Sequence, residues 1–283
     1  MGTSTSSSGP RSNISLDPPW LDGLSGAGGG GGDGNGAPPQ PPAPPGDGNP
    51  PPAAPQPKIA PARRYAGAKR NIGDFVKTGS RESLGRGIGQ YSRSGMGGAR
   101  QAARRMRAST HRGAGLVSFL QQVADRATPE TRRWVDDLNA MAPSVDAVVD
   151  AIVNAVMPTA GSVDEESMRD SMALALSELV ALDPTCDLLQ MRPDDTWTLM
   201  QLYLGQEVCN RIRFDAGQFF ESARLNPAVA VQREIEMREF IRNEVGAQLR
   251  TLRAAQPNPT RPQLESIMQD ALRLTFEVYE GML

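Results

Sequence analysis

SVDAVVDAIVNAVMP, residues 144–158, decides the fold class of this chain. Its apolar residues recur every three or four positions, which is the period of an α-helix and not the alternation of a β-strand. Ser144 stands at the N-cap position, where its hydroxyl accepts a hydrogen bond from a free backbone N–H, and Pro158 stops the helix. The apolar face consists of Val145, Val148, Val149, Ile152, Val153 and Val156. The stretch therefore predicts one amphipathic helix between two clear boundaries.

The same period continues through residues 113–283. A helix beginning near Ser162 carries acidic residues in its first turn, where they complement the helix dipole, and it ends at Pro184. Another helix begins after Pro193. A shorter helix is predicted to open at Thr128-Pro129-Glu130, with Thr128 as N-cap, and to carry Trp134 and Leu138. Further helices are predicted by the apolar patterns at 237–252 and 264–282. Because no convincing β-alternation interrupts these patterns, we expect an all-α, bundle-like body.

Composition and charge divide the chain into three segments. Residues 1–57 hold 13 Gly and 14 Pro, and they carry a net charge of −3. Residues 58–112 carry +12, and residues 113–283 carry −11. The first segment has too few apolar residues to offset the entropy of ordering, so we expect a disordered Gly/Pro/Ser-rich tail. The second is expected to be a basic, Gly-punctuated helical segment, and the third an acidic helical body.

The basic segment contains a run of arginines in the last of its predicted helices. Those helices are expected at 62–77, 81–93 and 98–107. Arg100, Arg104 and Arg107 fall on one helical face, with Arg105 beside them. Guanidinium groups in this arrangement bind phosphates or carboxylates. Two interpretations therefore stand: the segment docks onto the acidic body, or it contacts an anionic partner such as nucleic acid.

The sequence lacks the familiar constellations of catalytic residues. The one histidine, His111, lies in a loop-like Ser-Thr-His-Arg-Gly run, and nothing in its local sequence suggests that it forms a Ser–His–Asp or Cys–His triad. Cys186 and Cys209 are expected to be reduced core residues, and two cysteines with one histidine do not predict a zinc site. We therefore expect a protein that is not an enzyme and needs no metal or cofactor.

Acidic pairs and glycine runs have simpler explanations than ligand binding. The sequence has three acidic pairs: Asp136/Asp137, Glu165/Glu166 and Asp194/Asp195. The last two pairs lie at predicted helix N-termini, where acids are expected for dipole reasons rather than as Mg²⁺ ligands. The glycines at 85, 87 and 89 follow no strand and lack the Gly-Lys-Ser/Thr ending of a phosphate loop.

The start of the chain has chemistry of its own. Small Gly2 permits removal of Met1, which leaves a glycine amine whose ordinary pKa is near 8 and which is nucleophilic at neutral pH. Met-Gly-x-x-x-Ser, with Ser6, also matches the N-myristoylation pattern. No stretch approaches 18 consecutive apolar residues and no signal peptide is present, so we expect a soluble, cytoplasmic protein.

Several stretches resemble the QatB family of the bacterial Qat anti-phage system. At the N-terminus they are Met1–Pro10 and Pro18-Pro19-Trp20-Leu21. In the basic segment the resemblance runs from Gly73-Asp74-Phe75-Val76 through YSRSGMGG at 91–98, and at the C-terminus it is carried by ALRLTFEVYEG at 271–281. Similarity to this family spans nearly the whole chain and implies a non-enzymatic subunit of a defence operon.

The resemblance also implies partners and a modification. The other components of such an operon are an ATPase, a QueC-like enzyme (QatC) and a TatD-like nuclease. The family picture is that the QueC-like enzyme attaches a deazaguanine-type base to the N-terminal glycine, which is Gly2 here. Thr3 and Ser4 would then lie in the partner's active site, and Pro19, Trp20 and Leu21 would form a second contact with the partner. A tether of roughly 30 residues has a mean reach of about 30 Å, enough to cross a partner's face.

Two other classes of function remain open from sequence. The first is a basic nucleic-acid-binding adaptor in the same complex, which would use Arg100, Arg104, Arg105 and Arg107. The second is a membrane-associated protein acylated at Gly2, which requires a myristoyl transferase that bacteria generally lack. We expect the first function, modification of Gly2 by the QueC-like partner, and no membrane association.

Overall fold

Ten α-helices and one π-helix make up the regular structure of the described residues. The computed structural model describes residues 63–158, 161–217, 227–256 and 259–283, and no strand occurs among them. The helices are α2 (Ala66–Thr78), α3 (Arg81–Gln90), the π-helix η1 (Tyr91–Met96), α4 (Ala99–Arg105), α5 (Arg107–Ala124), α6 (Pro129–Ala140), α7 (Val145–Val156), α8 (Val163–Leu182), α9 (Pro193–Ala216), α10 (Pro227–Ala255) and α11 (Arg261–Glu280). The all-α prediction is confirmed. No helix in the described ranges combines the length and apolarity needed to cross a bilayer.

The predicted helix starts are present. Thr128, Ser144 and Ser162 each accept a hydrogen bond of 3.2 Å from the backbone N–H three residues further on. Each cap satisfies a donor that the first turn of a helix leaves free, which typically stabilises the helix by about 1 kcal/mol. Helix α9 begins with Pro193, whose missing N–H costs nothing at that position.

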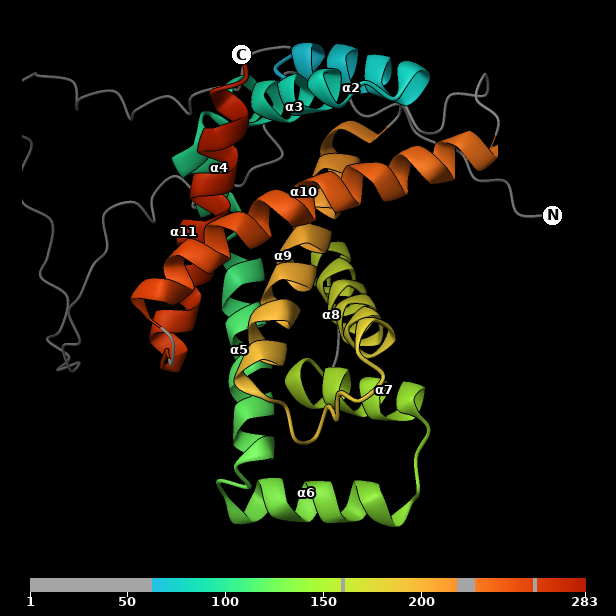
Figure 1. Cartoon of the computed structure of the whole chain (residues 1–283), viewed down its shortest axis with the longest axis vertical. Coiled ribbons are helices and arrows are strands. Elements are labelled where there is room, and N and C mark those ends of the chain that lie inside the picture. The colour runs from blue at the N-terminus through green and yellow to red at the C-terminus, as the bar shows by residue number, and fades with distance from the viewer. Residues whose placement is uncertain (1–62, 159–160, 218–226, 257–258) are drawn as a thin grey trace, which may run out of the picture. The chain divides into compact units, whose positions relative to one another are not determined.

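Helix α9 lies at the centre of the fold. It contacts α5, α8, α10 and α11, and Figure 1 shows α10 crossing over it. Leu199, Leu204, Val208 and Ile212 of α9 are completely buried. Burying one such side chain stabilises the fold by about 1.5–3 kcal/mol, so α9 supplies much of the driving force for packing.

The basic segment packs onto the acidic body. Helices α3 and α4 contact α11, and α2 contacts α10. The approach of α3 to α11 depends on Gly89, because a Cβ there would lie only 2.3 Å from the backbone oxygen of Tyr279. The described residues from Tyr65 onward form one compact unit, and the change of charge at residue 112 lies inside helix α5.

The second and third predicted helices have different ends in the structure. Helix α3 stops at Gln90, and the chain continues as the π-helix η1 to Met96. Tyr91 of η1 stacks on Tyr65, with ring centroids 5.5 Å apart. A Cβ at Gly95 would lie 2.4 Å from the Tyr65 ring, so only glycine leaves room for this stack. The third predicted helix ends at Arg105, and Met106 separates it from α5.

Candidate functional site

The residues that the sequence places in contact with a partner enzyme lie outside the described part of the chain. These residues are Gly2, Thr3, Ser4, Pro19, Trp20 and Leu21. Their roles therefore stay predictions.

The structure separates the predicted arginine run into two groups. Arg100 and Arg104, one turn apart on α4, are exposed, and neither forms an ion pair with another described residue. Arg107 begins α5, is exposed, and has its Nε 3.7 Å from Oε1 of Glu265. Arg105 is half-buried and lines a pocket. A basic surface therefore remains on α4, while Arg105 belongs to a different site.

His111 is not in a loop, which corrects the prediction. It lies in helix α5, where its Nδ1 is 2.9 Å from Oε2 of Glu265. The glycines that follow it resemble a loop in sequence, but Gly113 has a packing role. A Cβ at Gly113 would lie 2.4 Å from the Tyr203 ring, so the glycine lets α5 approach α9 closely.

In each acidic pair, at least one member serves as a cap or an ion-pair partner. Oε2 of Glu165 accepts a hydrogen bond of 2.7 Å from the N–H of Gly161, just before α8. Asp195 accepts hydrogen bonds from the backbone and the side chain of Arg192 at the start of α9. Both acids lie in the first turn of their helices, as predicted. The described residues contain no group of three or more potential ligands that would hold a metal ion.

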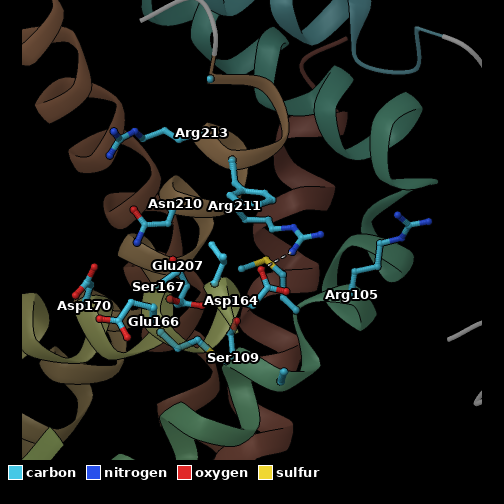
Figure 2. A pocket seen from close by; sticks show the side chains of 16 residues that line it. Arg105, Ser109, Asp164, Glu166, Ser167, Asp170, Glu207, Asn210, Arg211 and Arg213 are labelled. Atoms are coloured by element: carbon cyan, nitrogen blue, oxygen red, sulfur yellow. Dashed lines mark ion pairs between the residues drawn. The ribbon is translucent and has the colours of Figure 1, made fainter. Parts of the chain in front are cut away.

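A pocket of about 460 Å³ opens between three parts of the fold: the α4–α5 junction, the start of α8 and the second half of α9. We call it the α8–α9 pocket. The polar residues that line it are Arg105, Ser109, Asp164, Glu166, Ser167, Asp170, Glu207, Asn210, Arg211 and Arg213. Figure 2 shows that side chains from all three parts lie around one space. A pocket of this volume holds a small molecule or a long side chain.

Glu207 is the buried acidic residue of this pocket. Only 5 % of the residue is exposed, and its Oε1 accepts no hydrogen bond from the described residues. Burial raises the pKa of its carboxyl above the ordinary value, while the neighbouring hydroxyls of Ser109 and Ser171 partly counteract the rise. An unsatisfied carboxylate oxygen in such a place costs free energy that a suitable ligand would recover.

Arg211 connects the pocket to the basic segment. Its Nε lies 3.2 Å from Oδ2 of Asp215, and its Nη1 lies 3.8 Å from Oδ1 of Asp164. Tyr91 of η1 donates a hydrogen bond of 2.6 Å to the same oxygen of Asp215. Burial and the Asp215 carboxylate raise the pKa of Tyr91 well above its ordinary value, so the hydroxyl keeps its proton and donates. The π-helix is thus tied to one wall of the pocket.

Sequence reasoning missed Glu207, Asn210 and Arg211. All three lie on helix α9, and the polar spacing i, i+3, i+4 was a usable signal for a polar site on one helical face. No spacing in the sequence predicts that Ser109 and the start of α8 line the same pocket.

Part of the chain matches the model of a known protein family. Residues 97–279 match the family model described as QatB, Qat anti-phage system associated protein. The match covers more than half of the chain, beginning just before α4 and ending within α11. No curated protein and no solved structure matches the chain.

Proposed function

This chain belongs to the QatB family and has a role in the Qat anti-phage defence system; from this premise we propose that it is a non-enzymatic subunit that binds the QueC-like enzyme of that system (QatC). Gly2, once Met1 is removed, is the group presented to that enzyme for modification with a deazaguanine-type base. The ATPase and the TatD-like nuclease of the operon are further partners in this proposal.

The family match is the observation that carries the proposal. The matched residues lie within the compact unit, so the part of the chain shared with the family is the helical part. Gly2 precedes that part by more than 60 residues of mostly Gly- and Pro-rich sequence. A folded unit that binds a partner raises the effective concentration of any group tethered to it, which favours delivery of the terminal amine.

The non-enzymatic role is supported by the surroundings of the two residue types most used in catalysis. His111 faces Glu265 rather than a serine or cysteine. Both cysteines are buried, and burial raises the pKa of each thiol to about 11, which leaves little nucleophilic thiolate at neutral pH.

Intact-mass measurement of the full chain, co-expressed with the QueC-like partner, tests the modification. The expected species has lost Met1 and carries one adduct on Gly2. Gly2→Leu should keep Met1 and show no adduct, whereas Gly9→Leu, the same exchange seven residues further on, should be modified normally. An unmodified terminus in the wild-type protein, purified from cells that the operon protects, would contradict the proposal.

A second candidate function is a nucleic-acid-binding adaptor, which the exposed Arg100 and Arg104 favour. If both contact phosphates, the affinity for DNA falls steeply with salt, and the double variant R100Q/R104Q reduces the slope of log K against log[salt] by about 2. The matched control is R133Q/R250Q, which removes the same charge from exposed positions on α6 and α10. Equal slopes for the wild type and R100Q/R104Q would exclude this contact.

A further inference from the structure

We propose that the α8–α9 pocket binds an organic cation, a guanidinium or ammonium group on an apolar stem, with Glu207 as its anionic partner. The geometry of Glu207 is the first reason. The residue is 5 % exposed, it lines the pocket, and its Oε1 accepts no hydrogen bond from the described residues. Buried polar atoms in native proteins almost always have a partner, so this oxygen defines the ligand as a hydrogen-bond donor.

The charges around the pocket favour a cation. Two of its three arginines form ion pairs: Arg211 pairs with Asp215 and Asp164, and Nη1 of Arg213 lies 2.7 Å from Oε1 of Glu234. Arg105 interacts with other groups of the chain as well.

The acidic side chains of α8 that line the same pocket are less engaged. Glu166 and Asp170 form no side-chain hydrogen bond or ion pair with another described residue. Together with Glu207, they leave the pocket with an excess of negative charge, which attracts a positively charged ligand.

The apolar lining fits the stem of such a ligand. Val163 and Phe214 line the pocket and are each 68 % exposed, an unusual degree of exposure for large apolar side chains. Met106 and Met168 line it from the buried side. An exposed phenylalanine attracts a cation through its ring face, and the aliphatic stem of arginine or lysine covers apolar surface.

The ligand is an organic cation rather than a metal ion. The carboxylates of the pocket do not converge, since no described group of three or more acids, histidines or cysteines is placed to hold a metal. A volume of about 460 Å³ also exceeds what a single ion requires and suits a whole arginine side chain.

Titration of the full chain, labelled with ¹⁵N and followed by NMR, tests the site. The probes are arginine amide and citrulline amide, which have nearly the same shape but differ in charge. A third probe is the peptide Ac-Gly-Ala-Arg-Ala-Gly-NH₂. Arginine amide should shift the backbone signals of the residues lining the pocket and bind at least about tenfold more tightly than citrulline amide.

Two variants locate the effect at Glu207. Glu207→Gln keeps the shape of the side chain but removes its charge, and it should weaken arginine amide at least about tenfold. Glu239→Gln makes the same change at an exposed position of α10 outside the pocket and should leave the affinity unchanged. Retained signal dispersion in both variants confirms that they are folded.

The outcomes are distinct. Tighter binding of the peptide than of arginine amide assigns the cation to a polypeptide partner, and equal or weaker binding assigns it to a free small molecule; both support the site. No shifts at 10 mM arginine amide, equal binding of citrulline amide, or unchanged binding to Glu207→Gln would overturn it. This inference does not depend on the modification of Gly2, which the mass measurement tests separately.

Discussion

The α3–α11 contact and the α8–α9 pocket differ in how they use buried residues. At α3–α11, glycine brings two helix backbones together, with no room for even one added carbon at Gly89. In the α8–α9 pocket, long polar side chains line an open space, and one buried carboxylate oxygen has no hydrogen-bond partner among the described residues. The first arrangement is expected where only stability matters. The second keeps a group that is costly to bury, which is typical of a site with a function beyond the fold.

The largest effect is expected for Gly89→Ala. Alanine is favoured over glycine in a helix by about 1 kcal/mol, but its Cβ would lie 2.3 Å from the backbone oxygen of Tyr279, which cannot rotate away. Overpacking typically costs 1–3 kcal/mol and at times more, so we expect a net loss of about 2–3 kcal/mol in the free energy of unfolding. Urea denaturation followed by circular dichroism measures it.

Gly73→Ala is the matched control on the neighbouring helix α2. A Cβ at Gly73 meets no atom within 4 Å, so only helix propensity applies, and the variant should be more stable by about 0.5–1 kcal/mol. If the two variants shift stability in the same direction, the close approach of α3 to α11 is not what Gly89 provides.

Tyr91→Phe tests the link between the basic segment and the pocket. The variant removes the hydroxyl that donates to Asp215, a carboxylate whose side chain is only 12 % exposed. Leaving a buried acceptor short of a donor costs about 1–3 kcal/mol, and we expect about 1.5 kcal/mol because Arg211 still pairs with Asp215.

A double-mutant cycle with Asp215→Ala measures that coupling directly. The two substitutions should be non-additive by more than about 0.5 kcal/mol, since each removes the same hydrogen bond. Additive effects would mean that the hydrogen bond contributes nothing to stability.

Glu207→Gln should stabilise the protein by about 1 kcal/mol at pH 8. Because burial raises the pKa of Glu207 in the folded state, the unfolded chain releases this proton first as the pH rises from 4.5. The contribution of Glu207 to wild-type stability is therefore fully present below that pH and is lost as the pH rises to the folded-state pKa. The difference in the free energy of unfolding between Glu207→Gln and the wild type should therefore grow in favour of the variant from pH 4.5 to pH 8. Urea denaturation at both pH values measures it.

Glu239→Gln again provides the comparison, since that side chain is exposed and should change stability by less than about 0.5 kcal/mol at either pH. A Glu207→Gln variant that is less stable than the wild type at pH 8 would show that the carboxylate contributes to folding rather than to ligand binding.

The smallest effect is expected on the basic surface of α4. Arg100 and Arg104 are exposed and form no ion pair with another described residue, so R100Q/R104Q should change the free energy of unfolding by less than about 0.5 kcal/mol. A loss above 1 kcal/mol, measured in the same denaturation experiment, would show that these arginines support the fold instead of facing a partner.

Much of the fold was predictable from local sequence. The caps at Thr128, Ser144 and Ser162 and the proline at the start of α9 all lie where the sequence placed them, because capping involves residues only three positions apart. The predictions failed where glycine has a long-range role. Because Gly113 follows His111 closely, the sequence predicted a loop there, but the structure has helix α5. The absence of a side chain at Gly113 instead leaves room for Tyr203, 90 positions later.

Local sequence was sufficient to predict the helical period, most helix boundaries and the separation of charge along the chain, since each of these depends on neighbouring residues. The packing of the basic segment onto α10 and α11, and the pocket that Ser109, Asp164 and Glu207 line together, became visible only in the folded chain. Contacts of this kind depend on which apolar helix faces pack against each other. That packing is determined by residues far apart in the chain.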